Sequence, residues 1–207
     1  MNYELIRKNT NYIKFKVRNR KIIVIAPFGM PYELIEKYIQ KFKEKFKKEI
    51  NDFKIAYLLD KEPLSEILYL GKKYTLKLEK SITEISIKDN LIVIPIVKED
   101  INTSLLNWYK KRAEDILLGF CKKWEKILNI NSKKIRLKLM KTRWGSCNYN
   151  KRYINLNIEL LTKTMDFIDY VVLHEYAHIF HPNHSKEFYD FIRLYKPNYE
   201  IIIKTQR

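Results

Sequence analysis

The stretch Leu173-His174-Glu175-Tyr176-Ala177-His178-Ile179-Phe180-His181-Pro182-Asn183-His184 contains all four histidines of this 207-residue chain. It begins with the pattern H-E-x-x-H, which places the imidazoles of His174 and His178 one turn apart on the same face of a helix. A divalent ion can bind both rings, and the carboxylate of Glu175 then lies beside a metal-bound water as a general base. The spacing therefore predicts a metal site with hydrolytic chemistry.

The residues around this motif indicate that its helix is buried. From Phe167 to Phe180 the chain is apolar almost all round, as in a helix that packs inside a protein core. Glu175 is the only carboxylate between Asp169 and Glu187, and a buried carboxylate is costly unless it is paired or lies near a metal. A surface helix whose histidines cluster by accident would not have such flanks, which favours the metal site.

The third metal ligand is expected from the residues after the helix. His181 would lie roughly 10 Å along a continued helix from His174, which is too far for one ion to contact both. Pro182 disfavours helix at the preceding residue and predicts a turn, after which His184 can return to the metal. The spacing H-E-x-x-H-x5-H is that of the metzincin pattern, although His181 stands where that pattern has a glycine. We therefore expect His184 as the third ligand, with Glu187 as the alternative and His181 beside the site or at the surface.

Composition predicts a cytoplasmic chain. No run of residues approaches the length of a membrane span, and the charged N-terminus does not resemble a signal peptide. Two cysteines, Cys121 and Cys147, imply no disulfide framework and fit a reducing compartment. The net charge of +17, from 41 Lys and Arg against 24 Asp and Glu, can attract nucleic acid or another anionic ligand. Because no nucleic-acid motif accompanies this charge, we expect such binding to be weak and no membrane partner.

The pattern of strands and helices predicts an α+β fold with two regions. Residues 1–97 are expected to form a β-rich lobe with one helix, and residues 98–207 the catalytic region, together as one compact unit. The expected elements are hairpins within 12–26, 67–78 and 82–96, helices within 31–50, 103–128 and 187–194, and strands at 135–139 and 153–158. Ser185 is expected to cap the last of these helices.

A second informative segment, Arg143-Trp144-Gly145-Ser146-Cys147, lies between the last two predicted strands. Gly145 can mark a bulge or a close approach of the backbone. We expect this segment to form an edge strand beside the metal, where an extended peptide can bind by strand addition. Arg143 can stabilise a developing oxyanion or pair with a carboxylate, and Cys147 is expected to be a structural thiol.

With these residues identified, the chain resembles the YgjP-like metallopeptidase family, whose relatives include the SprT-like and WLM zincins. The likeness rests on residues 143–147, Ile154-Asn155-Leu156-Asn157, residues 170–178, and Pro182-Asn183-His184-Ser185 with Phe188. It implies a zincin-like catalytic region behind the β-rich lobe. It also implies zinc bound by His174, His178 and His184, with Glu175 as the catalytic residue.

Hydrolysis of a peptide or an unfolded protein is the function expected of such a site. Glu175 accepts a proton as zinc-activated water attacks an amide carbonyl, and then returns the proton to the leaving amine. Two alternatives remain open: a metal-dependent pyrophosphatase of nucleoside triphosphates such as UTP, and a nucleic-acid-associated module with structural zinc. Only four glycines are present to build a phosphate-binding loop. Three ligands leave one coordination position open, which favours catalysis over a structural site.

Overall fold

The computed structural model describes residues 3–18, 21–42, 66–96 and 100–206. The chain divides into two compact units, Met1–Phe53 and Lys54–Arg207. Helices and three small sheets are mixed along the described residues, in agreement with a mixed α and β class. The expected boundary between residues 97 and 98 lies outside the described residues and stays a prediction.

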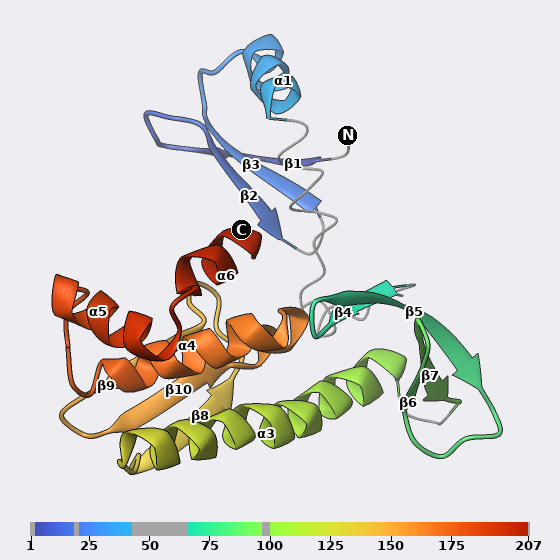
Figure 1. The fold of residues 1–207 in the computed structure, drawn as a ribbon. Coiled ribbons are helices and arrows are strands. Elements are labelled where there is room, and N and C mark those ends of the chain that lie inside the picture. The colour runs from blue at the N-terminus through green and yellow to red at the C-terminus, as the bar shows by residue number, and fades with distance from the viewer. Residues whose placement is uncertain (1–2, 19–20, 43–65, 97–99, 207) are drawn as a thin grey trace. The chain divides into compact units, whose positions relative to one another are not determined.

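The described residues of the first unit form a three-stranded sheet and one helix (Figure 1). Its elements are β1 (Tyr3–Lys8), β2 (Lys14–Arg18), β3 (Lys21–Pro27) and α1 (Tyr32–Lys41). The central strand β3 pairs antiparallel with β2, which confirms the first hairpin, and parallel with β1, which was not predicted. Side chains of β3 and α1 form the core of this unit: Ile22, Val24, Ala26, Ile35 and Ile39. The predicted helix within 31–50 is present as α1, and its part beyond residue 42 lies outside the described residues.

The described part of the second unit begins with a four-stranded sheet in the order β4-β5-β7-β6. Its strands are β4 (Glu66–Tyr69), β5 (Lys72–Glu79), β6 (Ser86–Lys88) and β7 (Leu91–Pro95). The antiparallel pairs β4–β5 and β6–β7 confirm the two predicted hairpins. In the β4–β5 turn Gly71 has a φ of +78°, and a Cβ there would lie 2.6 Å from Cγ2 of Thr164. Only glycine therefore allows this turn to pack against Thr164.

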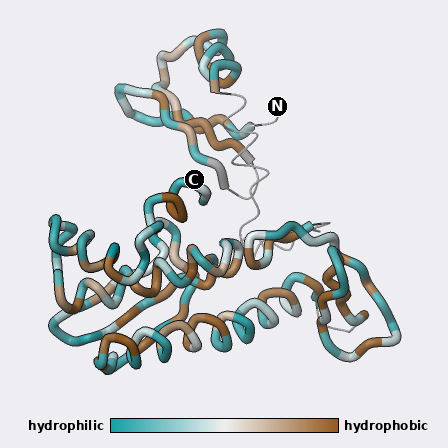
Figure 2. The backbone as a smooth tube through the Cα atoms, in the orientation of Figure 1, coloured by the Kyte–Doolittle hydropathy of each residue, from teal (hydrophilic) through white to brown (hydrophobic). Residues whose placement is uncertain are grey.

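Helix α3 (Ile101–Leu128) confirms the long helix predicted within 103–128. Its N-terminus is capped by Asp100, whose carboxylate accepts a hydrogen bond from the backbone N–H of Thr103 (3.1 Å). Hydrophobic and hydrophilic residues alternate along α3 (Figure 2), as expected of a helix with one buried face. That face packs against the 3-10 helix η2 (Ile158–Thr162) and against α4 (Met165–Ala177).

A second three-stranded sheet precedes α4 in the sequence and contacts this helix. It consists of β8 (Lys134–Lys138), β9 (Gly145–Asn148) and β10 (Tyr153–Asn157). The central strand β10 pairs parallel with β8 and antiparallel with β9. The strands predicted at 135–139 and 153–158 are thus confirmed, and residues 145–148 form an edge strand that contacts α4.

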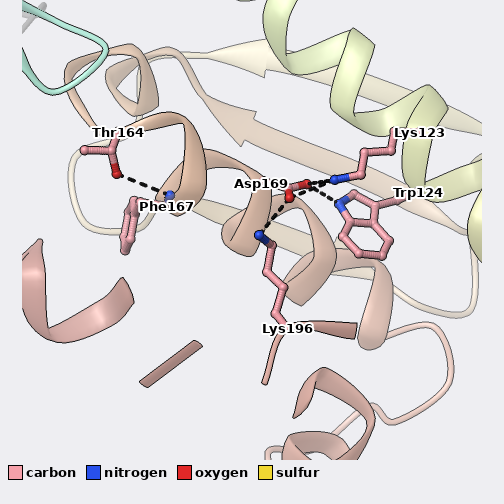
Figure 3. Close-up of polar contacts among 6 residues, drawn as sticks. All are labelled: Lys123, Trp124, Thr164, Phe167, Asp169 and Lys196. Atoms are coloured by element: carbon pink, nitrogen blue, oxygen red, sulfur yellow. Dashed lines mark hydrogen bonds and ion pairs between the residues drawn. The ribbon is translucent and has the colours of Figure 1, made fainter. Parts of the chain in front are cut away.

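Helix α4 carries the H-E-x-x-H motif and is buried on nearly every side, as predicted. The hydroxyl of Thr164 caps it by accepting a hydrogen bond from the backbone N–H of Phe167 (3.4 Å; Figure 3). The helix ends at Ala177, with the second histidine, His178, as its C-cap residue four positions before Pro182, in agreement with the predicted turn.

Two short helices follow, α5 (Lys186–Tyr195) and α6 (Tyr199–Thr205). Ser185 is the N-cap residue of α5, but its hydroxyl donates to the carboxylate of Glu187 (2.6 Å) and makes no capping bond to the backbone. The predicted helix within 187–194 and the position of Ser185 at its N-terminus are thus confirmed, but the side-chain hydrogen bond to the backbone that such a cap usually makes is not formed. Helix α6 was not predicted, because seven residues are too few to give a clear helical periodicity. Among the described residues, no helix is both long and apolar enough to cross a membrane.

Asp169 anchors α4 to its neighbours through a network of polar contacts (Figure 3). Its carboxylate accepts hydrogen bonds from Nε1 of Trp124 (2.7 Å), Nζ of Lys123 (2.8 Å) and Nζ of Lys196 (2.8 Å). Burial raises the pKa of Asp169, but the hydrogen bonds and positive charges of the lysines outweigh it and hold that pKa below 3.8. The network thus fixes α4 against α3 and against the residue that follows α5.

The change Asp169→Asn should lower the free energy of unfolding by about 3 kcal/mol near pH 7, because it leaves the buried Lys196 ammonium without its anionic partner. The folded-state pKa of Asp169 is lowered, so its stabilisation is fully present above the unfolded-state pKa and is lost as the pH falls through the folded-state value. The stability difference between wild type and variant should therefore shrink below pH 3.8. Urea denaturation of both proteins across this range measures it, and a difference that does not depend on pH would contradict the ion-pair explanation.

Candidate metal centre

Three of the four histidines converge at the C-terminal end of α4. His174 lies in the last turn of the helix, His178 is its C-cap residue, and His184 returns after the turn at Pro182. One ring nitrogen from each of the three residues lies within 4.8 Å of the others. Nε2 of His184 lies only 3.0 Å from Nε2 of His174. The three imidazoles therefore present their nitrogen atoms to one small volume.

Oxygen atoms on the far side of two rings orient them. Nδ1 of His174 lies 3.3 Å from the hydroxyl of Tyr170, and Nδ1 of His178 lies 3.4 Å from the backbone carbonyl of His181. We place the proton on Nδ1 in both rings, because each Nδ1 then donates to an oxygen atom. Nε2 of each ring consequently keeps its lone pair for a metal ion, which is the usual arrangement around histidine ligands. His181 thus contributes its carbonyl group to the site.

Aromatic side chains of α5 pack against the three imidazoles. Phe188 on α5 is fully buried, and its ring centroid lies 4.9, 4.7 and 4.8 Å from those of His174, His178 and His184. Tyr189 stacks on His184 at 6.1 Å. This support was missed in the sequence. The signal that could have revealed it is the spacing of Phe188, four residues after His184 and four before Ile192, on the buried face of α5.

The donor set suits a divalent metal ion such as zinc. Burial, together with the neighbouring His178 and His184, lowers the pKa of His174 to about 3, and burial also lowers the pKa of His178. Both rings are therefore neutral near pH 7, which is the form that binds metals. Within the described part of the chain no fourth protein ligand joins the three nitrogens. Three imidazoles with one open position are typical of catalytic zinc sites.

Neither His181 nor the alternative ligand Glu187 joins this group. The ring of His181 packs against Phe191, with the centroids 5.4 Å apart. Glu187 is exposed at the start of α5, and its carboxylate accepts the hydroxyl of Ser185. The structure therefore places His184 with His174 and His178, and neither His181 nor Glu187 belongs to this group; that His184 is the third ligand stays a prediction.

Glu175 lies one residue after the first histidine and is only 5% exposed. Its Oε2 atom is buried and has no hydrogen-bond partner among the described residues. Burial raises the pKa of Glu175 to about 8, although the positive charge of Arg143 acts in the opposite direction. Burying a carboxylate oxygen without a hydrogen bond costs free energy. Oε2 of Glu175 is therefore suited to accept a hydrogen bond from a donor that binds together with the metal or with the substrate.

The edge strand β9 approaches Glu175 through a glycine. A Cβ atom at Gly145 would lie 2.5 Å from Oε1 of Glu175 and 2.7 Å from its Cδ. The close backbone approach predicted at Gly145 is thus confirmed. Cys147 lies farther along the same strand, where burial and the charge of Glu175 raise its pKa to about 12. Its thiol therefore stays protonated, in agreement with a structural role.

The change Gly145→Ala should lower kcat/KM for hydrolysis by about 100-fold, because a displacement of a catalytic group by ~1 Å can cost that much. The added methyl group meets the flexible end of Glu175 rather than backbone, so the protein should fold and should keep its metal. Gly119→Ala on α3 is the matched control, since a Cβ there meets nothing within 4 Å. Steady-state kinetics and metal analysis of both variants test this, and a Gly145→Ala protein with normal kcat/KM would show that Glu175 is not held in place by β9.

Arg143 precedes this strand and has an exposed side chain. Its backbone carbonyl accepts a hydrogen bond from the amide of Asn157 (3.0 Å), which also bonds the carbonyl of Met140 (2.9 Å). None of the ion pairs among the described residues includes Arg143. Its guanidinium therefore contributes positive charge near Glu175 without a carboxylate partner.

The chain has matches among protein families and among solved structures. A family model described as YgjP-like, metallopeptidase domain, matches residues 11–205. Among solved structures, the chain is similar to the metallopeptidase zymogen jannalysin of Methanocaldococcus jannaschii, with 25% identity over 44% of this chain and 86% of that one and a TM-score of 0.39. It is also similar to the metallopeptidase zymogen abylysin of Pyrococcus abyssi, with 19% identity over 44% of this chain and 96% of that one and a TM-score of 0.36. No curated protein matches.

Proposed function

Because the chain belongs to the YgjP-like metallopeptidase family, we propose that it is a zinc-dependent peptidase. In this proposal His174, His178 and His184 bind the metal and Glu175 transfers the proton. One observation supports it above the others: three imidazole nitrogens lie within 4.8 Å of one another, and one of these rings shares a cavity wall with a buried carboxylate whose Oε2 has no partner among the described residues. Zinc, when bound, supplies a Lewis acid that polarises a carbonyl oxygen and makes water more acidic.

Glu175 is the proposed general base and general acid. Its Oε2 atom accepts a proton from the attacking water, and the same atom later donates that proton to the leaving amine nitrogen. The surroundings of Glu175 favour both steps, since burial raises its pKa to about 8 and so makes the carboxylate a stronger base. A bound dication would lower this pKa again, and the protonated form would then be limited to the interval between the two transfers.

Two further features favour a peptide as the substrate. Strand β9 pairs only with β10 among the described strands, so its other edge is available to an extended peptide backbone. The guanidinium of Arg143 is exposed beside Glu175 and can stabilise the negative charge that develops on the carbonyl oxygen. We propose that the peptide lies along β9 with its scissile carbonyl between Arg143 and the histidines.

The experiment that tests the proposal combines metal analysis with a substrate screen. We expect the purified protein to contain about one zinc per chain, to cleave members of a peptide library, and to lose this activity with a chelator and regain it with zinc. UTP and ATP are assayed in parallel. Chelator-sensitive release of pyrophosphate without peptide cleavage would replace the proposal with the nucleotide alternative, and stoichiometric zinc without either activity would favour a structural metal.

A further inference from the structure

A cavity of about 390 Å³ opens directly beside the candidate catalytic groups. Both His174 and Glu175 contribute to its wall. The rest of the lining is mainly apolar and aromatic, with Trp144, Phe167, Val171 and Ile203 among its members. A space of this size is at the lower end of the range for small-ligand sites and can hold one large side chain.

The aromatic walls of the cavity are held in a defined geometry. The rings of Trp144 and Phe167 meet edge to face, with centroids 5.8 Å apart and an interplanar angle of 85°. Nζ of Lys163 lies 5.3 Å from the centroid of the Trp144 ring and also donates a hydrogen bond to the backbone carbonyl of Gln206 (3.2 Å). Lys163 thereby links the end of α6 to Trp144. The cavity is therefore preformed, which reduces the entropic cost of binding.

The last helix of the chain supplies one wall. Ile203 on α6 lines the cavity, and so does Gln206, the residue directly after α6. The backbone carbonyl of Gln206 accepts the hydrogen bond from Lys163. Tyr199 at the start of α6 stacks on Tyr170, with centroids 6.0 Å apart and an interplanar angle of 12°. Because Tyr170 contacts His174 through its hydroxyl, α6 is attached both to the cavity and to the candidate metal ligands.

From these contacts we infer that the cavity is a specificity subsite for an aromatic side chain of the substrate, on a residue that directly flanks the scissile bond, and that Ile203 limits its size. The position of the subsite next to the scissile bond follows from the presence of His174 and Glu175 in the cavity wall. The preference for an aromatic side chain follows from the edge-to-face aromatic lining. This inference rests on the proposed peptidase function. It assigns to the C-terminal helix a role in substrate choice.

Binding and cleavage are measured separately to test the inference. The probes are acetyl-Gly-Phe-Gly-amide, acetyl-Gly-Trp-Gly-amide and acetyl-Gly-Ala-Gly-amide, titrated by NMR into the zinc-loaded Glu175→Gln protein. We expect the Phe probe to bind at least about 10-fold more tightly than the Ala probe, since filling an apolar pocket improves discrimination between ligands by roughly 10- to 200-fold. Cleavage of the same central residues in longer peptides by the wild type should show the same order.

Variants at two positions of one helix provide the control. Ile203→Trp should reduce the preference for Phe over Ala to below about 2-fold, because it fills the space that the Phe ring needs. Ile203→Ala should instead increase the affinity for the Trp probe relative to the Phe probe. Ile201→Trp is the matched control, because Ile201 is 61% exposed on the same helix and does not line the cavity. It should leave all affinities unchanged.

The outcomes separate the inference from the proposed function. Equal affinity for the Phe and Ala probes, or a preference that neither Ile203 variant alters, would overturn the subsite whether or not peptides are cleaved. A clear preference in binding without any cleavage by the wild type would support the subsite and overturn the peptidase proposal. The circular dichroism spectrum of each variant identifies one that has failed to fold, in which case the other Ile203 variant decides.

Discussion

Replacing Glu175 with Gln should lower kcat/KM for peptide hydrolysis by about 1,000-fold or more and leave the zinc content unchanged. The amide has the size of the carboxylate but cannot accept the proton of the attacking water. Glu175 is not one of the three converging nitrogen donors, so its loss should not weaken the metal site. Its Oε2 atom has no hydrogen-bond partner among the described residues, so the change breaks no hydrogen bond of this atom within that part of the chain.

The matched control for this variant is Glu187→Gln. Glu187 is also a glutamate near the histidines, but it is exposed and bonded to Ser185. We expect wild-type kinetics from it. The measurement is a kcat/KM determination on the best peptide from the library, with zinc quantified in the same samples. A Glu175→Gln protein that kept wild-type kcat/KM would remove Glu175 from the mechanism, and one that lost its zinc would show that the carboxylate helps to hold the metal.

Replacing His184 with Ala should weaken zinc binding by more than about 100-fold. Loss of a residue that only hydrogen-bonds a metal ligand already lowers metal affinity by ~10- to 100-fold, and loss of a ligand itself should cost more. His184 is the member of the triad that follows the turn after α4, and its Nε2 atom approaches that of His174 to 3.0 Å. Without it only two protein donors remain, and two imidazoles on one helix cannot complete a tetrahedral site. Activity should fall in proportion to the metal that is lost.

His181→Ala is the control for this variant, since His181 lies three residues away and contributes its backbone carbonyl rather than its ring. It should bind zinc as the wild type does. Competition with a chromogenic chelator gives the affinities of both variants. Unchanged affinity in His184→Ala, together with a loss in His181→Ala or Glu187→Ala, would transfer the third ligand to one of the alternatives.

Much of the fold could be predicted from local patterns. The hairpin around Gly71, the long helix ending at Leu128 and the turn at Pro182 each depend on residues a few positions apart. The same holds for His174 and His178, whose spacing alone puts them on one face of α4. The parallel pairing of β1 with β3 was not predicted, because pairing between strands that are not joined by a hairpin leaves no local signal in the sequence. The short helix α6 was not predicted either, because two turns are too few to show a helical period.

The sequence by itself determined the chemistry available to this protein: two imidazoles and a carboxylate on one buried helix, with a third imidazole within reach after a proline. Only the tertiary structure decided how that chemistry is arranged. It placed Gly145 of an edge strand against Glu175, Phe188 behind all three imidazoles, and Ile203 in the wall of the cavity. The physical reason is that spacing along one helix follows from its fixed 3.6-residue turn. Contacts between segments far apart in the chain depend on packing, which no short stretch of sequence encodes.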